Sequence, residues 1–425
     1  MDPMWIVLGI MLVFVIGMLS NKYSFGTVTV GCLVLLVLFG IQTPAEAFSG
    51  FGSGQIILMG GMFVISYAFG KTSVVDKVQA LLFSNKGAKS DLAIAAIMLG
   101  FTALLCQFVT SIISVLMIMM SFMAALGHKS SVTASRMMLP VTFIASIFVA
   151  RFPIGGGGAS GHVIVNAMLE GAGVVERLDI TSITKASLIP ALLCLVYSIV
   201  SYKMLPDREV VINETAGKKD GPKLSKKDET IVVVVFVATI IGMVFGAKLG
   251  DTMYVIPALG VIVMLVLKVL NAKEVLGVLA NDTLFMGAGV IALSNAMTNS
   301  GAGAWIGTLV QKLLGGNPAP IVLLVVFSVT SVIMTTFMSN FVTMMVLSPI
   351  AIQVCTACGY DSRAVLLCIH FLVWAAIITP MASPATALAY GTAGLSVRET
   401  MKWTVPAVLI ATVSVIVCSM IAYPM

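Results

Sequence analysis

Two stretches rich in helix-breaking residues interrupt apolar segments of the sequence. Residues 151–161 read Arg-Phe-Pro-Ile, four glycines and Ala-Ser-Gly, and residues 379–386 read Thr-Pro-Met-Ala-Ser-Pro-Ala-Thr. Because proline removes a backbone donor and glycine disfavours a helix, each stretch predicts a broken helix. Carbonyl groups freed at such a break can ligate a cation, and the N-termini of half-helices can hold an anion. The alternative is a packing kink that binds nothing.

A tip with hydroxyl side chains precedes each break. Val109-Thr110-Ser111 precedes the first break, and Met338-Ser339-Asn340-Phe341-Val342-Thr343 precedes the second. Hard cations prefer oxygen ligands, so these short side chains suit Na⁺, and they can also form hydrogen bonds to a carboxylate. Ser and Asn are good N-caps as well, so the same residues could cap the helix that follows each tip.

These stretches lie in a chain of 425 residues, of which 59% are hydrophobic and 10% are charged. Soluble proteins carry about 25% Asp, Glu, Lys and Arg, so the composition excludes a soluble enzyme, a disordered chain and a nucleic-acid-binding protein. The mean hydropathy of +1.09 agrees. We expect an all-α polytopic membrane protein whose helices satisfy their own backbone groups in lipid. No cofactor is expected.

The order of apolar segments repeats in the two halves of the chain. A shift of 227 residues places Pro153 on Pro380, and Ser111 meets Ser339 with one residue of slippage. A duplicated chain with a hydrophilic linker is typical of secondary transporters. Each half holds one hairpin, which adds an even number of crossings to about five other spans. Each half therefore crosses an odd number of times, and the second repeat must be inverted.

The predicted organisation follows from these segments. The first repeat covers 1–205, with a hairpin over about 92–127 and a broken helix over about 137–172. A linker covers 206–229. The second repeat covers 230–425, with a hairpin over about 319–358 and a broken helix over about 364–395. Segments 73–85 and 302–315 are amphipathic and precede the hairpins, which indicates interfacial helices that carry them.

The distribution of basic residues predicts the orientation. With a cytoplasmic linker and re-entrant hairpins, 18 of the 24 Lys and Arg residues fall on the cytoplasmic side, 5 fall outside, and Arg151 lies within the membrane. This bias supports ten spans with both termini outside, and we expect a bacterial plasma membrane. A buried guanidinium can hold a carboxylate through two hydrogen bonds. The alternative for Arg151 is a contact with the interface or a backbone carbonyl.

The paired tips and breaks define the candidate site residues. We expect substrate to be bound by Ser111, Ser339, Asn340, Thr343, Thr379, Pro380, Ser383, Thr386 and, as a counter-charge, Arg151. We expect Na⁺ to be held by Thr110, Ser111, Ser114, Gly156, Ser339, Asn340 and Ala382. No Asp or Glu lies clearly at mid-membrane, which disfavours a proton antiporter.

The second tip and break resemble the divalent anion:sodium symporter family, within the ion transporter superfamily and its citrate-transporter-like domain. The resemblance rests on Ser339-Asn340 through Thr343, Ser348-Pro349, Thr379-Pro380 through Pro384-Ala385-Thr386-Ala387 and Tyr390-Gly391, and on Gly50-Phe51-Gly52, Gly61-Met62-Phe63-Val64 and Val165-Asn166-Ala167-Met168-Leu169-Glu170 in the first half. It implies a homodimer that moves a transport domain past a scaffold. Ser111-Ile112-Ile113-Ser114 departs from the family pattern because it lacks Asn and Thr.

We therefore expect a secondary active transporter of a small anion similar to a di- or tricarboxylate, coupled to Na⁺ and working by elevator-type alternating access. A cation/proton antiporter or an anion efflux protein of the same superfamily is the alternative, with H⁺ in place of Na⁺. A remote alternative is an intramembrane serine protease, because Gly158-Ala159-Ser160-Gly161 fits GxSG and two histidines, His162 and His370, are present. A protease would not explain the duplicated halves.

Overall fold

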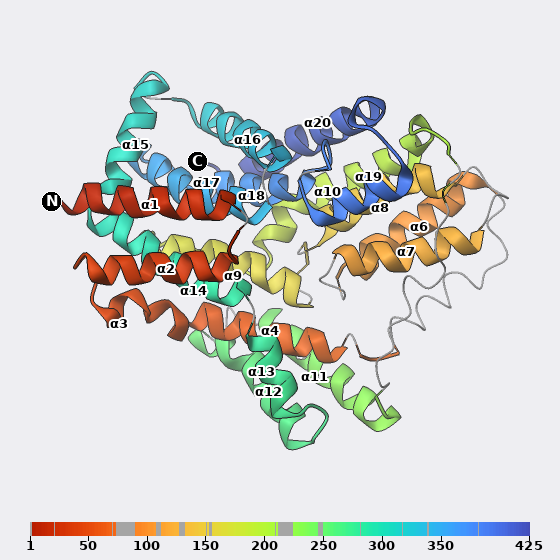
Figure 1. The fold of residues 1–425 in the computed structure, drawn as a ribbon, viewed down its shortest axis with the longest axis horizontal. Helices are drawn as coiled ribbons and strands as arrows, with labels where there is room; N and C mark the ends of the chain where they lie inside the picture. Colours follow the sequence, from red (N-terminus) through yellow and green to blue (C-terminus); the bar gives the residue numbers. More distant parts are fainter. Residues whose placement is uncertain are drawn as a thin grey trace.

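The fold consists of packed helices (Figure 1). The computed structural model describes residues 2–20, 22–69, 71–73, 90–107, 112–126, 132–149, 151–152, 155–208, 210, 224–244, 250–280, 282–316, 318–337, 340–380 and 382–425. Within these residues every regular element is a helix and no strand is present. The predicted all-α class is therefore confirmed.

Before the turn at residues 202–204, the first half contains ten helical elements among the described residues. They are α1 (Pro3–Ser20), α2 (Phe25–Leu38), α3 (Pro44–Ala47), η1 (Ser49–Gly52), α4 (Gly54–Phe69), α6 (Asp91–Leu105), α7 (Ile112–Leu126), α8 (Ala134–Phe148), α9 (Gly155–Gly171) and α10 (Ser182–Ser201). The turn η3 (Tyr202–Met204) continues α10 towards the linker. Helices α6 and α7 occupy the range of the first predicted hairpin, and the predicted interfacial helix 73–85 falls almost wholly outside the described residues.

The second half repeats this order. It contains α11 (Lys226–Val244), η5 (Gly250–Val255), α12 (Ile256–Val266), α13 (Ala272–Leu279), α14 (Asp282–Asn299), α15 (Ala302–Leu313), α16 (Pro320–Phe337), α17 (Asn340–Cys358), α18 (Arg363–Leu372), η6 (Val373–Ala375), α19 (Pro384–Ala393) and α20 (Val397–Ala422). Helices α16 and α17 occupy the range of the second predicted hairpin. Helix α15 corresponds to the predicted interfacial segment 302–315.

Several helices have the length and composition of membrane spans. Four described helices qualify directly, at Ser182–Met204, Pro320–Phe337, Asn340–Cys358 and Val397–Ala422, and a fifth qualifies if the bent pair α13 and α14 is one span. Seven further apolar helices have 10–17 residues. Large apolar side chains such as Leu38, Val266 and Ile421 are exposed on them, as a lipid-facing surface requires. The predicted number of ten spans stays a prediction.

Contacts between helices recur in equivalent pairs across the two halves. Helix α2 packs on α14, and the equivalent contact in the other half is that of α12 with α4. Helix α3 also packs on α14, and the equivalent contact is that of α13 with α4. Likewise α6 packs on α8 as α16 packs on α18, and α8 packs on α10 as α18 packs on α20. In Figure 1 the helices α3, α4 and α11 to α13 lie along one edge, away from α16, α18 and α20. The second helix of each half therefore packs against the other half.

One pair of contacts breaks this symmetry. Helix α9, which follows the first break, packs on both α4 and α14. Among the described residues, its counterpart α19 makes no comparable contact with α4 or α14 and packs on α7 and α8 instead. The two broken helices therefore have different neighbours.

A close approach between the halves lies at Gly50 of η1. A Cβ atom added there would lie 1.9 Å from the carbonyl oxygen of Ala288 in α14. Because a backbone oxygen cannot rotate away, Gly50→Ala must push η1 from α14, and we expect a loss of about 2 kcal/mol or more in the free energy of unfolding. Thermal unfolding of the purified protein measures this effect. Gly52→Ala is the matched control because nothing lies within 4 Å of its Cβ position. Equal melting temperatures for the two variants would contradict the prediction.

Candidate functional site

The second break begins where η6 ends and stops at the first residue of α19. Residues 376–380 and 382–383 have no regular structure, so the break starts three residues before the predicted stretch 379–386. Pro384 opens α19 at a position where proline suits a helix, and the hydroxyl of Ser383 accepts from the backbone N–H of Thr386 at 3.1 Å. The two hydroxyl groups also lie 2.7 Å apart. Ser383 and Thr386 therefore cap the half-helix.

Hydroxyl groups of the hairpin connect it to this break. The Thr335 hydroxyl, near the end of α16, lies 3.0 Å from the Asn340 side-chain oxygen and 3.0 Å from the Val373 carbonyl oxygen. The Thr379 hydroxyl donates to the carbonyl oxygen of Thr336. Thr335 is 1% exposed and Asn340 is 8% exposed. The structure therefore places Asn340 and Thr379 against two adjacent residues at the end of α16, Thr335 and Thr336.

The carbonyl groups of the second break face neutral donors. The Tyr390 hydroxyl lies 3.1 Å from the carbonyl oxygen of Ile377 and 2.9 Å from that of Ile378. The N–H of Ala382 donates to the carbonyl oxygen of Thr379 at 3.4 Å. A carbonyl oxygen has two lone pairs, so each of these groups can still accept from, or ligate, a further partner.

Unpartnered polar atoms gather on the same elements. The hydroxyl oxygens of Thr343 and Ser348 in α17 and the indole nitrogen of Trp374 in η6 are buried without a hydrogen-bond partner. The Trp374 ring packs edge-on against Phe341 at the tip, with ring centroids 5.5 Å apart. A buried polar group without a partner costs about 1–3 kcal/mol. A polar ligand at the tip would remove this cost.

The first break is shorter than its sequence predicts. Helix α9 begins at Gly155, so the glycines of the predicted stretch 151–161 are helical. Tertiary packing can override the low helix preference of glycine, and Gly161 has such a contact, because a Cβ there would lie 2.3 Å from the Nε2 atom of His370.

Gln107 bridges the first hairpin and the first break. Its amide nitrogen donates to the carbonyl oxygens of Ala103, in its own hairpin helix, and Phe148, at the end of α8, both at 2.9 Å. This contact is placed like that of Thr335 with Val373 in the second half. The Gln107 side chain is 5% exposed, and its oxygen has no partner.

Some predicted ligands cannot be placed. Thr110, Ser111 and Ser339 lie outside the described residues. Ser114 lies in α7 and Gly156 in the first turn of α9, with no description of their side-chain surroundings. At the first turn of a helix the backbone N–H groups are free rather than the carbonyl groups, so the position of Gly156 suits an anion better than a cation.

Arg151 is 1% exposed and lies between the two halves. Its Nε atom donates to the carbonyl oxygen of Ile147, and its guanidinium lies 4.6 Å from the ring centroid of Phe371. Its Nη1 atom is 3.5 Å from Nδ1 of His370, and its Nη2 atom has no partner. Within the described part of the chain no carboxylate forms an ion pair with it.

Sequence reasoning did not place Gln107, Thr335, Trp374 and Tyr390 among the site residues, although Tyr390 belongs to the family resemblance, and it considered His370 only as a protease residue. The available signal was a polar side chain at the end of an apolar run, which Gln107 and Thr335 share. The protease reading fails on packing, because His370 contacts Arg151 and His162 bonds the backbone carbonyl of Leu178.

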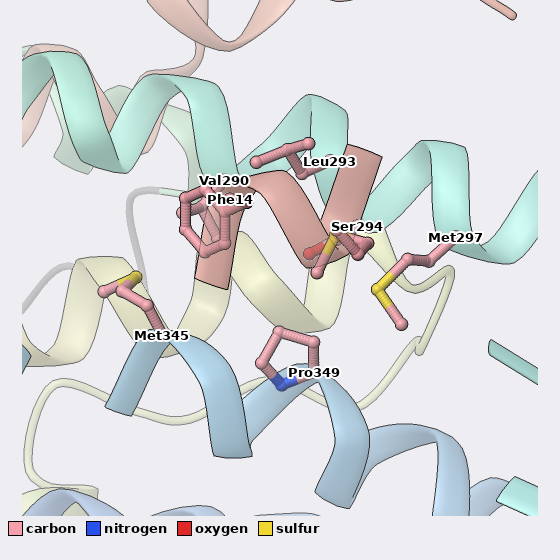
Figure 2. Close-up of a pocket in the computed structure, with 8 residues that line it drawn as sticks. Phe14, Val290, Leu293, Ser294, Met297, Met345 and Pro349 are labelled. Atoms are coloured by element: carbon pink, nitrogen blue, oxygen red, sulfur yellow. The ribbon is translucent and has the colours of Figure 1, made fainter. Parts of the chain in front are cut away.

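A small pocket lies elsewhere, between α1, α14 and α17 (Figure 2). Its lining consists of Met11, Phe14, Val290, Leu293, Ser294, Met297, Met345 and Pro349. It holds no charged side chain and one hydroxyl group, so it does not suit an anion. Among the described residues no cluster of His, Cys, Asp and Glu could hold a metal ion, so a cation bound at the second tip would be held by neutral oxygen atoms.

Solved structures with the same fold are transport proteins. The YdaH transporter of Alcanivorax borkumensis superposes with a TM-score of 0.64 at 13% identity, covering 99% of this chain and 98% of that one. MtrF of Neisseria gonorrhoeae superposes with a TM-score of 0.58 at 12% identity, covering 91% and 84%. At these identities the likeness concerns the fold alone.

Relatives by sequence are also transporters. YflS of Bacillus subtilis, a candidate malate transporter, is 25% identical over 73% of this chain and 68% of its own length. Dicarboxylate transporter 1 of Arabidopsis thaliana chloroplasts is 26% identical over 73% of this chain, which spans 58% of the plant protein. An uncharacterised transporter of Synechocystis is 26% identical over 48% of this chain, which spans 32% of that protein.

The family model of citrate transporters matches residues 6–378, and a second match covers 252–424. The matches span both hairpins and both breaks described above. This family and these relatives are transporters rather than enzymes, which confirms the prediction that the chain is a membrane transporter and excludes the protease. The chain belongs to the citrate transporter family.

Proposed function

We propose that the protein is a secondary active transporter of a small di- or tricarboxylate and that Na⁺ drives the transport. The observation that carries the proposal is the junction of the second tip with the second break, where Asn340 and Thr379 contact the adjacent residues Thr335 and Thr336 and where the polar atoms of Thr343 and Trp374 have no partner. Hydroxyl, amide and indole groups can donate hydrogen bonds to a carboxylate. The names of the relatives from Bacillus and Arabidopsis support this substrate class.

In this proposal the two halves contribute similar groups. Ser339, Asn340, Thr343, Thr379, Pro380, Ser383 and Thr386 meet the anion in the second half, with Ser111 and Arg151 in the first. Na⁺ is held at the second tip by oxygen atoms of Ser339, Asn340 and Ala382. A break that lines a buried site is the arrangement in which irregular backbone is tolerated within a membrane.

We include an inverted second repeat and elevator-type movement in the proposal. The equivalent helix contacts of the two halves support a pseudo-twofold relation. The unequal contacts of α9 and α19 support alternating access. A site that is open to one side of the membrane requires one broken helix to lie against the opposing helices while its counterpart lies away from them. A homodimer in the plasma membrane completes the proposal.

The orientation with a cytoplasmic linker is also proposed. The start of the linker is tied to the starts of two helices, since Asp207 lies 3.1 Å from Arg136 near the start of α8, and Arg208 pairs with Glu399 in the first turn of α20. These basic residues therefore share one side with the linker, which fits the positive-inside rule.

A cation/proton antiporter has less support. Proton relays in membranes use buried carboxylates or histidines. In the described part of the chain the buried polar side chains include no Asp or Glu, and the two buried histidines contact Arg151 (His370) and the carbonyl oxygen of Leu178 (His162).

A ligand-dependent shift of the melting temperature tests the substrate class. Purified protein would be heated with succinate, malate, citrate or sulfate, in NaCl and in choline chloride. A ligand that binds only the folded protein at 100 times its Kd adds about 2.7 kcal/mol to the free energy of unfolding. We expect at least one carboxylate to raise the melting temperature, and to do so more strongly in NaCl. No shift with any carboxylate in either salt would contradict the proposal.

A further inference from the structure

Arg151 lies in surroundings that differ from those of a surface arginine. It is fully buried, and a buried charge is costly unless partners compensate it. The partners present are the carbonyl oxygen of Ile147, the face of the Phe371 ring and an imidazole nitrogen of His370. All three are neutral groups that stabilise a cation. One nitrogen of the guanidinium, Nη2, has no partner.

The groups that hold Arg151 come from both halves. Ile147 lies in α8 of the first half, while His370 and Phe371 lie in α18 of the second. The second ring nitrogen of His370 faces α9, where a Cβ atom at Gly161 would lie only 2.3 Å from it. The imidazole is therefore held between the guanidinium and a glycine of α9. To accept from Arg151, its Nδ1 atom must be unprotonated, with the proton on Nε2.

The carbonyl groups at the first break face a cationic side chain as well as neutral donors. The carbonyl oxygen of Ile147 accepts from Arg151, that of Phe148 accepts from Gln107 at 2.9 Å, and that of Arg151 accepts from the Thr184 hydroxyl at 2.5 Å. In the second break the corresponding groups meet neutral hydroxyls, and none of the described residues places a cationic side chain on them. A fixed positive charge repels another cation strongly in a medium of low dielectric constant.

We propose that Arg151 is a built-in cation of the first half, which takes the place of a bound Na⁺ ion there, and that His370 and Gly161 position its guanidinium for the transported anion. This inference rests on the proposed function. It replaces the first-half cation site predicted at Thr110, Ser111, Ser114 and Gly156 and leaves one ion site, at the second tip. The free Nη2 atom of Arg151 donates to a carboxylate of the anion.

Two consequences follow. Anion binding depends on at most one Na⁺ ion, because the guanidinium of Arg151 is one of the two positive charges near the anion. The affinity for the anion depends on where His370 holds the guanidinium, so His370 is a positioning residue rather than a ligand.

The experiment measures the apparent Kd of full-length purified protein for succinate, or for the carboxylate that shifts its melting temperature most, over a series of Na⁺ concentrations. Choline keeps the ionic strength constant. The variants are Arg151→Gln, Arg151→Lys, His370→Asn, His370→Leu and Gly161→Ala. Arg177→Gln, at a half-buried arginine outside the proposed site, and Gly100→Ala, at a helical glycine with nothing within 4 Å of its Cβ position, are the matched controls.

For the wild type we expect a plot of log affinity against log Na⁺ concentration with a slope no greater than one. Arg151→Gln should weaken binding tenfold or more at every Na⁺ concentration, and Arg151→Lys should weaken it less. His370→Leu and Gly161→Ala should weaken binding about threefold to tenfold, whereas His370→Asn, which keeps an acceptor near Nδ1, should restore most of the affinity. The two controls should bind like the wild type.

Each part of the inference is contradicted by a different result of this experiment. A wild-type slope of two means that a Na⁺ ion binds in the first half and overturns the built-in cation. Unchanged affinity in His370→Leu and Gly161→Ala, with weak binding in Arg151→Gln, overturns the positioning role alone. Unchanged affinity in both Arg151 variants overturns the whole inference and the placement of Arg151 at the anion, while carboxylate transport itself stands. If Arg151→Gln elutes as an aggregate on gel filtration, Arg151→Lys and Gly161→Ala decide the outcome. No carboxylate binding by the wild type refutes the proposed function itself.

Discussion

Replacing Asn340 with Ala is expected to reduce carboxylate uptake at least tenfold while the protein remains folded. Asn340 opens α17 and is 8% exposed, and its side-chain oxygen lies 3.0 Å from the Thr335 hydroxyl. A hydrogen bond to a charged group contributes about 1.5–3 kcal/mol, which corresponds to a change of roughly tenfold to a hundredfold in binding. Loss of a side chain at a helix start costs about 1 kcal/mol of stability. Initial uptake rates in proteoliposomes and melting temperatures measure the two effects separately.

The matched control for this change is Asn299→Ala. Asn299 ends α14 and is exposed, so its loss removes an amide of the same type outside the site. We expect its uptake to equal that of the wild type. If Asn340→Ala transports as well as Asn299→Ala, the second tip does not bind the anion and the site assignment is wrong.

The second large effect is expected for Thr335→Val, which removes one hydroxyl group and keeps the shape of the side chain. This hydroxyl lies 3.0 Å from both Asn340 and the carbonyl oxygen of Val373, and the residue is 1% exposed. The hydroxyl has one proton, so its loss leaves one of these two buried acceptors without a donor, at a cost of about 1–3 kcal/mol. Because the hydroxyl joins the hairpin tip to the break, we expect uptake to fall about tenfold. The same proteoliposome assay measures this change.

Thr336→Val is the control for the neighbouring position. The Thr336 hydroxyl donates to the carbonyl oxygen of Val332, one turn earlier in the same helix, at 2.7 Å. Its removal therefore disturbs α16 alone and should leave uptake within about twofold of the wild type. Equal losses in Thr335→Val and Thr336→Val would indicate that the helix, rather than the junction of tip and break, determines transport.

The fold class could be predicted because the composition and the repeated order of apolar segments are read directly from the sequence. The small charged fraction excluded a soluble protein, and Pro380 and Pro384 located the second break within a few residues. The earlier start of that break, at Ala376, had no signal because residues 376–378 are apolar. The first break was predicted too long, because four glycines indicate a broken helix locally while packing against His370 favours a helix at this place.

The junctions within the site could not be predicted from one sequence. Arg151 and His370 are 219 residues apart in the chain, and Thr335 and Val373 are 38 apart. Such contacts depend on which helices pack together, and the hydropathy pattern carries no information on that choice. The order of hairpin and break did predict that the second tip lies near the second break, and Asn340 and Thr379 contact the adjacent residues Thr335 and Thr336.

The most direct test of the central claim is accumulation of a labelled carboxylate in proteoliposomes that contain the wild-type protein. The carboxylate is the one that shifts the melting temperature most, and an inward Na⁺ gradient is compared with an equal choline gradient. We predict that the Na⁺ gradient drives accumulation above the external concentration, and that choline and protein-free liposomes do not. Equal uptake with Na⁺ and choline would contradict Na⁺ coupling, and uptake equal to that of protein-free liposomes would contradict carboxylate transport.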